Sequence, residues 1–179
     1  MLRYTLYEIR RSVLSFSSLF YTIIMPVGLY LLFGALQDYA KIKVADGNAA
    51  AYVMIGIALY GAISCTVSIS GLTVVENVAG WGRQLGLTPM NTGKYLLSKC
   101  CVAFIMAAVP ITAVNIVARM TKIDMPLKQQ IACAALSILC AMVFGFFGLA
   151  IGFLVPSESA VGIANGILVV FSFFGTLFA

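Results

Sequence analysis

Charged residues are scarce in this chain. Only 9% of its 179 residues are Asp, Glu, Lys or Arg, whereas 62% are hydrophobic. Ordinary soluble domains carry about 25% charged residues. Six acidic and eleven basic residues are too few to build the polar surface that a soluble protein of this size needs. The composition therefore indicates an integral membrane protein.

Histidine is absent, which excludes imidazole acid–base chemistry and His-ligated metal sites. The five cysteines form no C-x-x-C pair and lie within or beside apolar runs, as is typical of packing residues. A P-loop is also absent, because position 88 is Thr rather than Gly and the lysine of Thr92-Gly93-Lys94-Tyr95 is followed by Tyr. We therefore expect no enzyme activity, no catalytic residues and no metal in this chain.

Five apolar runs are long enough to cross a membrane, which takes about 20 helical residues. None of them contains Asp, Glu, Lys or Arg. Placing one such charge at the centre of a span would cost about 2.5–3.5 kcal/mol. The sequence thus predicts an all-α fold, a polytopic bundle forming one domain over residues 1–179. Its five predicted transmembrane spans cover residues 16–36, 51–75, 100–118, 131–155 and 160–179.

Residues 1–15 precede the first span and predict an amphipathic helix lying in the membrane interface. Apolar residues recur there every three or four positions, and the basic residues Arg3, Arg10 and Arg11 occupy the remaining surface. The alternative is that this segment is only a charged anchor for the first span.

Basic residues cluster in the connections between the apolar runs, so the net charge of +5 gives no indication of nucleic-acid binding. We expect membrane lipid as the surrounding partner instead. The N-terminal side of the predicted spans carries six Lys and Arg residues and the opposite side five. Such a small difference does not fix the topology.

The second predicted span is rich in hydroxyl groups, and two interpretations remain open. Its side chains either make close contacts between helices or line a path for a substrate. Glu158, beside Pro156 at the start of the fifth span, is the nearest candidate for a proton carrier; the alternative is a solvated charge at a helix start, because an acidic residue is in any case favoured in a first helical turn. The hydroxyl-bearing candidates for a substrate path are Ser64, Thr66, Ser68 and Ser70.

Residues 76–99 form a long polar, glycine-rich connection between the second and third spans. Trp81 suits the headgroup layer, and the nearby glycines allow close approach of another backbone. Thr88 before Pro89 predicts that one short helix ends near Leu87 and that another begins at Pro89. On these grounds the segment is either an ordinary loop with a Trp anchor or a docking element for a soluble partner.

The order of residues in this connection resembles the cytoplasmic segment between spans 2 and 3 of ABC-2-type transporter permeases, particularly the drug-export-like permeases of actinobacteria. An acidic residue, Gly-Trp, Arg-Gln-Leu, Leu-Thr-Pro and the downstream Lys99 occur in the family's order. In that family the segment is the coupling helix that contacts a separate ATP-binding subunit. The docking residues implied here are Glu76, Gly80, Trp81, Arg83, Gln84, Leu85, Thr88 and Pro89.

Two features depart from the family pattern. Asn77 stands where family members often have a basic residue, which would weaken or retune docking. The family has six spans, so we expect that the C-terminal portion of the permease, including a sixth span, is missing here.

The resemblance implies the permease subunit of an ABC exporter that moves an amphiphilic or apolar, drug-like or lipid-like substrate. It implies a P-loop ATP-binding partner that holds ATP and Mg, and a second permease subunit, identical or different. It also implies a multi-pass protein of the cell membrane with a cytoplasmic N-terminus. One alternative is a secondary transporter, which would need ionisable groups in the spans or paired broken helices. The other is a non-transporting scaffold, an accessory or immunity-type protein.

Overall fold

The computed structural model describes residues 2–14, 20–37, 42–44, 47–81, 92–121, 123–155, 157 and 159–175. Almost all of these residues are helical. The elements in chain order are α1 (Leu2–Leu14), η1 (Phe20–Ile24), α3 (Met25–Tyr30), η2 (Leu31–Ala35), β1 (Lys43–Val44), β2 (Gly47–Asn48), α4 (Ala49–Glu76), η4 (Asn77–Trp81), α6 (Thr92–Met120), α7 (Leu127–Leu154) and α8 (Ser159–Phe174).

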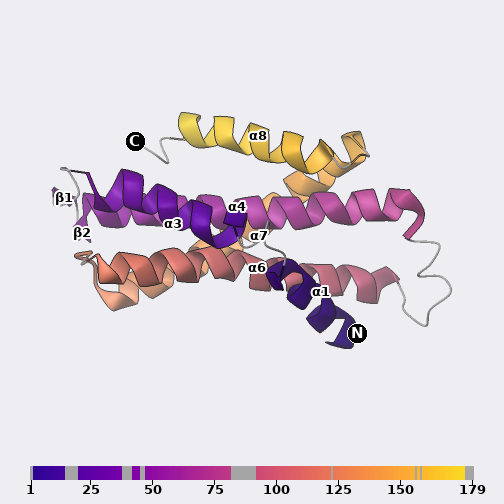
Figure 1. The fold of residues 1–179 in the computed structure, drawn as a ribbon, viewed down its shortest axis with the longest axis horizontal. Helices are drawn as coiled ribbons and strands as arrows, with labels where there is room; N and C mark the ends of the chain where they lie inside the picture. The colour runs from indigo at the N-terminus through magenta and orange to yellow at the C-terminus, as the bar shows by residue number, and fades with distance from the viewer. Residues whose placement is uncertain are drawn as a thin grey trace.

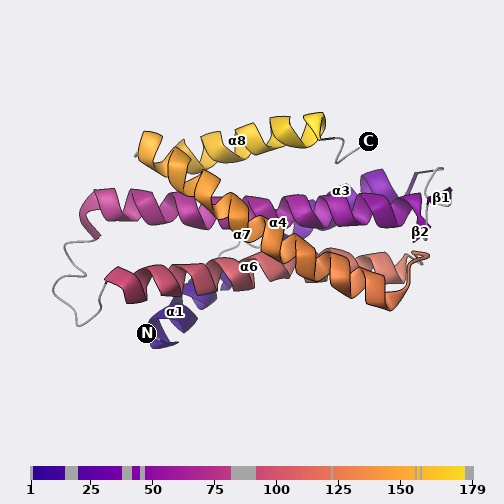
Figure 2. The ribbon, with the colours of Figure 1, turned by 180° about the vertical axis from the view of Figure 1, so that it is seen from behind.

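Helix α4 is the centre of the bundle. It packs against α6, α7, α8 and the η1–α3–η2 segment, while α1 lies against α6 (Figure 1). From behind, α7 crosses both α4 and α6 (Figure 2). In the apolar 18-residue stretch that makes each helix a candidate span, 56% is buried in α4 but only 22% in α7. A helix that is apolar on all sides is expected to be buried, and the central position of α4 agrees with its sequence.

The predicted all-helical bundle is confirmed for the described residues, apart from the two-residue strands of the β1–β2 hairpin. By length and composition, α4, α6 and α7 are long and apolar enough to span a membrane. The first and fifth predicted spans correspond to the shorter apolar helices Phe20–Ala35 and Ser159–Phe174. Five spans therefore remain a prediction.

Two prolines in different apolar helices meet the same glycine of α4. A methyl group added to Gly61 would lie 3.0 Å from Cβ of Pro110 in α6 and 3.1 Å from Cγ of Pro26 in α3. Pro26 lacks a backbone N–H, and it lies in the short helix α3 between two π-helical turns, where the regular α-helical hydrogen-bond pattern is interrupted. Gly61 thus lets three helices approach closely at one level.

The small-residue motif Gly148-x-x-x-Gly152 joins α7 to α4. A methyl group at Gly148 would collide with the carbonyl oxygen of Val67, and one at Gly152 would lie 2.9 Å from Cβ of Val74. By contrast, Gly162 of α8 has open space where a methyl group would be added. Close packing through small residues is expected between helices in a membrane.

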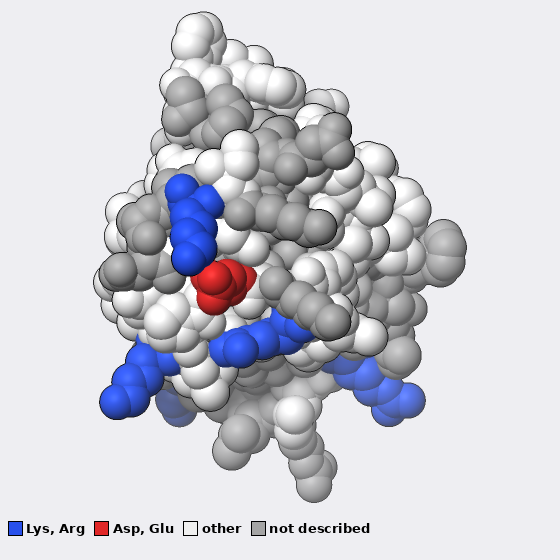
Figure 3. Space-filling model, turned by 90° about the vertical axis from the view of Figure 1, so that its left-hand side faces the viewer, with Lys and Arg blue, Asp and Glu red and all other residues white. Residues whose placement is uncertain are grey.

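The end of the bundle that carries the hairpin is polar. Asn48 caps α4 by accepting a hydrogen bond from the Ala51 amide at 3.1 Å. Buried Gln130 of α7 joins this helix to α6, because it donates to Asn115 Oδ1 at 2.7 Å and accepts from Arg119 Nε at 2.6 Å. Basic side chains and an acidic one lie on this end of the molecule (Figure 3).

Candidate functional site

Helix α4 ends at the start of the predicted docking segment. The Asn77 side chain donates to the Thr73 carbonyl at 2.9 Å, and the chain leaves the helix at Gly80, whose φ is +96°. That conformation favours glycine, so Gly80 suits a helix terminus. The side chains of Trp81 and Arg3 are not described. Five other predicted docking residues lie wholly outside the described residues, namely Arg83, Gln84, Leu85, Thr88 and Pro89.

Lys99 connects three elements near this point. It lies on α6 and is only 7% exposed. Its ammonium group donates to Glu8 Oε1 of α1 and, at 2.8 Å, to Glu76 Oε2 at the end of α4. Tyr95 adds a hydrogen bond from its hydroxyl to Glu76 Oε2 at 3.2 Å. We call Glu8, Glu76, Tyr95 and Lys99 the Lys99 cluster.

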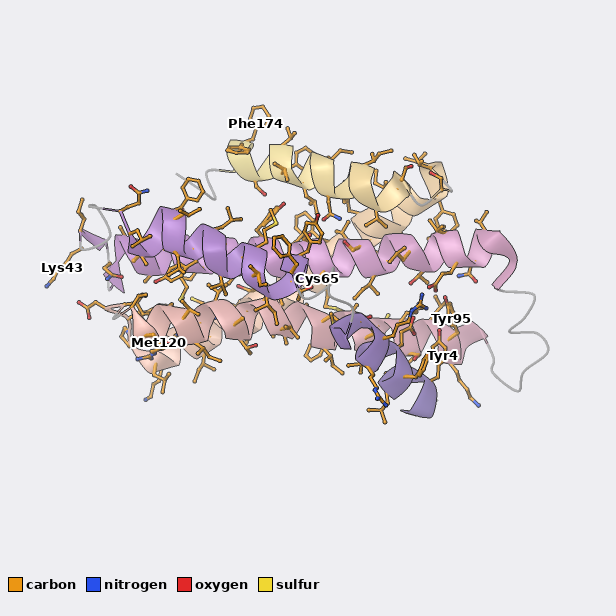
Figure 4. All side chains as sticks on the ribbon, in the orientation of Figure 1. Tyr4, Lys43, Cys65, Tyr95, Met120 and Phe174 are labelled. Carbon is orange, nitrogen blue, oxygen red and sulfur yellow. The ribbon has the colours of Figure 1, made fainter. Side chains whose placement is uncertain are left out.

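Two further contacts hold α1 against α6 beside the Lys99 cluster. The hydroxyls of Thr5 and Ser98 are 2.7 Å apart, and the rings of Tyr4 and Tyr95 lie 6.3 Å apart between their centroids (Figure 4). On α6, Ser98 and Lys99 follow Tyr95 by three and four positions, so the three residues share one face of the helix. The inner face of α1 is therefore polar and aromatic, while Leu6 is 61% exposed on its outer surface.

The electrostatics of the Lys99 cluster depend on its single ammonium group. That ammonium also lies 5.5 Å from the centroid of the Tyr95 ring, within range of a cation–π attraction. Two carboxylates share one cation, and Glu8 Oε2 is buried without a hydrogen-bond partner among the described residues. Removing one partner of a buried ion pair costs about 3–5 kcal/mol, and partial exposure of Glu76 reduces this cost here.

A cavity of about 380 Å³ opens beside the Lys99 cluster and is lined by Tyr4, Tyr7, Glu8, Arg11 and Glu76. Arg11 is one helical turn after Glu8, and both Arg10 and Arg11 are exposed. Two of the three arginines of the predicted interfacial helix are thus exposed, and Arg11 also borders the cavity. Both acidic residues of the Lys99 cluster therefore border this cavity.

The four hydroxyl residues of the second predicted span point toward neighbouring helices. Ser64 donates to Asn165 Oδ1 of α8 at 2.6 Å, and Asn165 Nδ2 donates to Ser68 at 2.9 Å. Thr66 donates to the Ala141 carbonyl of α7 at 2.8 Å, and Ser70 Oγ lies close to Gly145. These contacts are what the helix-packing interpretation expects. The role of the four residues in a substrate path stays a prediction.

Comparison with protein families now adds to this geometry. The family model described as ABC-2 type transporter matches residues 2–179. The chain belongs to the ABC-2 type transporter family. Neither the curated proteins nor the solved structures give a significant match. Membership makes the chain a membrane-embedded permease subunit of an ABC transporter, and it implies association with an ATP-binding subunit in general.

Sequence reasoning found Glu76 and Lys99 in this ABC-2 permease but not the residues that complete the cluster. Glu8 is the only acidic residue in the first fifteen positions, and it follows Tyr4 by one helical turn. That spacing was the signal for a polar inner face on α1. Asn165 gave no comparable signal, because a single amide in an apolar run does not reveal which helix it contacts.

Proposed function

We propose that this chain is the permease subunit of an ABC exporter in the cell membrane, and that residues 76–99 dock on the ATP-binding subunit at the cytoplasmic side. The observation that carries the proposal is the meeting of Glu76, α1 and α6 at the Lys99 cluster. The docking segment leaves the bundle from this meeting point. A force on the segment would therefore reach three helices at once.

The proposed mechanism needs two membrane-domain states that the ATP-bound and ATP-free partner stabilise to different extents. Pressure on residues 76–99 and on α1 would shift α4 and α6 together, because the end of α4 and the first turns of α6 meet at the Lys99 cluster. ATP and Mg belong to the partner subunit. Two permease subunits, identical or different, complete the proposed transporter.

The proposed substrate is amphiphilic or apolar. Charged residues lie at the helix ends and outside the five apolar runs, so the membrane interior offers no charged site for a small ion. A proton relay also lacks an ionisable carrier within the apolar runs. Both observations favour an exporter over a secondary transporter.

Co-purification tests the docking assignment. Arg83→Glu combined with Leu85→Asp reverses a charge and removes an apolar contact in the proposed docking surface. We expect this double variant to lose at least about tenfold in affinity for the ATP-binding subunit, since each such hot spot typically contributes more than 1 kcal/mol. Lys128→Glu combined with Leu127→Asp, at exposed positions at the other end of the bundle, is the matched control and keeps binding. Unchanged assembly and ATP hydrolysis in the first variant would refute the assignment.

A further inference from the structure

The Lys99 cluster joins elements that are far apart in the sequence. Glu8 and Lys99 are 91 positions apart, and Glu76 and Lys99 are 23 apart. Lys99 is almost fully buried between the two carboxylates. We propose that Glu8 and Lys99 are positioning residues for coupling: through Lys99, α1 follows the end of α4 when the docking segment moves. This inference rests on the proposed function.

Burial makes the shared ammonium a strong link. At the low effective dielectric of a buried site, opposite charges attract more strongly than on a solvated surface. The Lys99 ammonium pairs with both Glu8 and Glu76. A displacement of Glu76 therefore changes the position of the ammonium and with it the strength of its attraction to Glu8. The carboxylate of Glu8 cannot be left unpaired at low cost, because its second oxygen is already buried without a partner among the described residues.

The cavity beside the Lys99 cluster allows a second arrangement. Arg11 and Glu8 line the same cavity from successive turns of α1. In this second arrangement Lys99 moves toward Glu76, and Glu8 turns toward Arg11, the basic residue of α1 that lines the same cavity. Coupling between sites requires such a two-state element, whose balance both sites change. A shift of Glu76 thereby alters how firmly α1 is held on α6.

The first test measures whether Glu8 and Lys99 position α1. In a background with Ala at the five native cysteines, spin labels are attached through Leu6→Cys and Leu97→Cys, which replace exposed residues of α1 and α6. We expect a single narrow distance distribution. Glu8→Gln, which keeps the Lys99–Glu76 pair, and Lys99→Met should both broaden it. Lys128→Met, which replaces an exposed lysine at the other end, should not. Unchanged distributions in both cluster variants would overturn the proposal.

The second test uses the complete permease in lipid nanodiscs with its co-purified ATP-binding subunit. Permease-dependent stimulation of ATP hydrolysis should fall at least about fivefold in Glu8→Gln, while the affinity for the ATP-binding subunit stays at the wild-type value. Lys99→Arg, which keeps the charge, should restore much of the stimulation lost in Lys99→Met. Wild-type stimulation in Glu8→Gln would overturn the positioning role.

The two tests separate this inference from the proposed function. A wild-type permease that binds no ATP-binding subunit would refute the proposed function, and with it the role of the Lys99 cluster in coupling. The distance measurement needs no partner. It would then still show whether Glu8 and Lys99 hold α1 on α6.

Discussion

Single polar side chains in the described bundle form hydrogen bonds between helices. Thr66 is fully buried and donates to the backbone of α7, whereas Thr112 is exposed and bonds only carbonyls of its own helix. Each hydroxyl also lies within hydrogen-bond distance of the carbonyls three and four positions earlier in its own helix. The two residues therefore differ mainly in one interhelical bond.

Replacing Thr66 by Val should lower the free energy of unfolding by about 0.5–1.7 kcal/mol, the range of single interhelical hydrogen bonds in membrane proteins. Thr112→Val is the matched control and should change it by less than about 0.5 kcal/mol, as surface substitutions usually do. Unfolding in mixed detergent and SDS measures both values. Equal effects in the two variants would mean that the bond to the Ala141 carbonyl contributes nothing.

The sequence predicted that the hydroxyl residues of α4 either pack between helices or line a substrate path, but it could not choose between these two roles. The choice depends on which helix lies opposite each residue. Ser64 and Ser68 both bond Asn165, which is 101 and 97 positions away. No local pattern contains information about a contact so distant in sequence.

At the scale of helices, the same glycine spacing occurs in α7 and α8, but it marks a close helix contact only in α7. Gly148 and Gly152 pack against α4, while Gly162 and Gly166 have open space around an added methyl group. The two motifs look alike in the sequence because both are Gly-x-x-x-Gly. Their surroundings differ because α7 crosses α4 closely, whereas Gly162 and Gly166 lie on an exposed face of α8.

Gly148→Ala should lower the free energy of unfolding by about 1–3 kcal/mol, because the new methyl group collides with the backbone of α4 and forces the helices apart. Gly166→Ala makes the same chemical change in open space. It should be neutral or stabilising by up to about 1 kcal/mol, since alanine favours a helix over glycine. Thermal unfolding in detergent compares the two variants, and a stability loss in Gly166→Ala equal to that in Gly148→Ala would contradict this packing scheme.

Helix positions were largely predictable, and helix ends less so. The central helix α4 matches its predicted span within two residues, because its apolar run is bounded by Asn48 and Glu76. Helix α6 begins at Thr92, eight positions before the predicted span at Cys100 and three after the helix start predicted at Pro89, which lies outside the described residues. Residues 92–99 are helical although they include two lysines, since Tyr95, Ser98 and Lys99 pack against α1 and Glu76.

Taken as a whole, the molecule separates its described charges into two groups at opposite ends of the long helices. One end carries the end of α4 and the start of α6, with Glu76, Lys94 and Lys99, and the other carries Lys43, Arg119, Asp124 and Lys128 of the β1–β2 hairpin, the end of α6 and the segment that leads into α7; Tyr95 and Lys43 mark these two ends in Figure 4. Both ends are rich in basic residues. This is why the distribution of lysine and arginine gave no clear orientation, although the two ends themselves are clearly defined.

The orientation can be measured with one cysteine at each end of the bundle. Lys43→Cys and Lys94→Cys replace exposed residues on the two ends, in the background with Ala at the native cysteines. If α1 and residues 76–99 face the cytoplasm, a membrane-impermeant maleimide should label position 43 in intact cells and position 94 only after permeabilisation. Each variant thus serves as the control for the other. Labelling of position 94 in intact cells would place the Lys99 cluster outside the cell, where no cytoplasmic ATP-binding subunit can reach the docking segment.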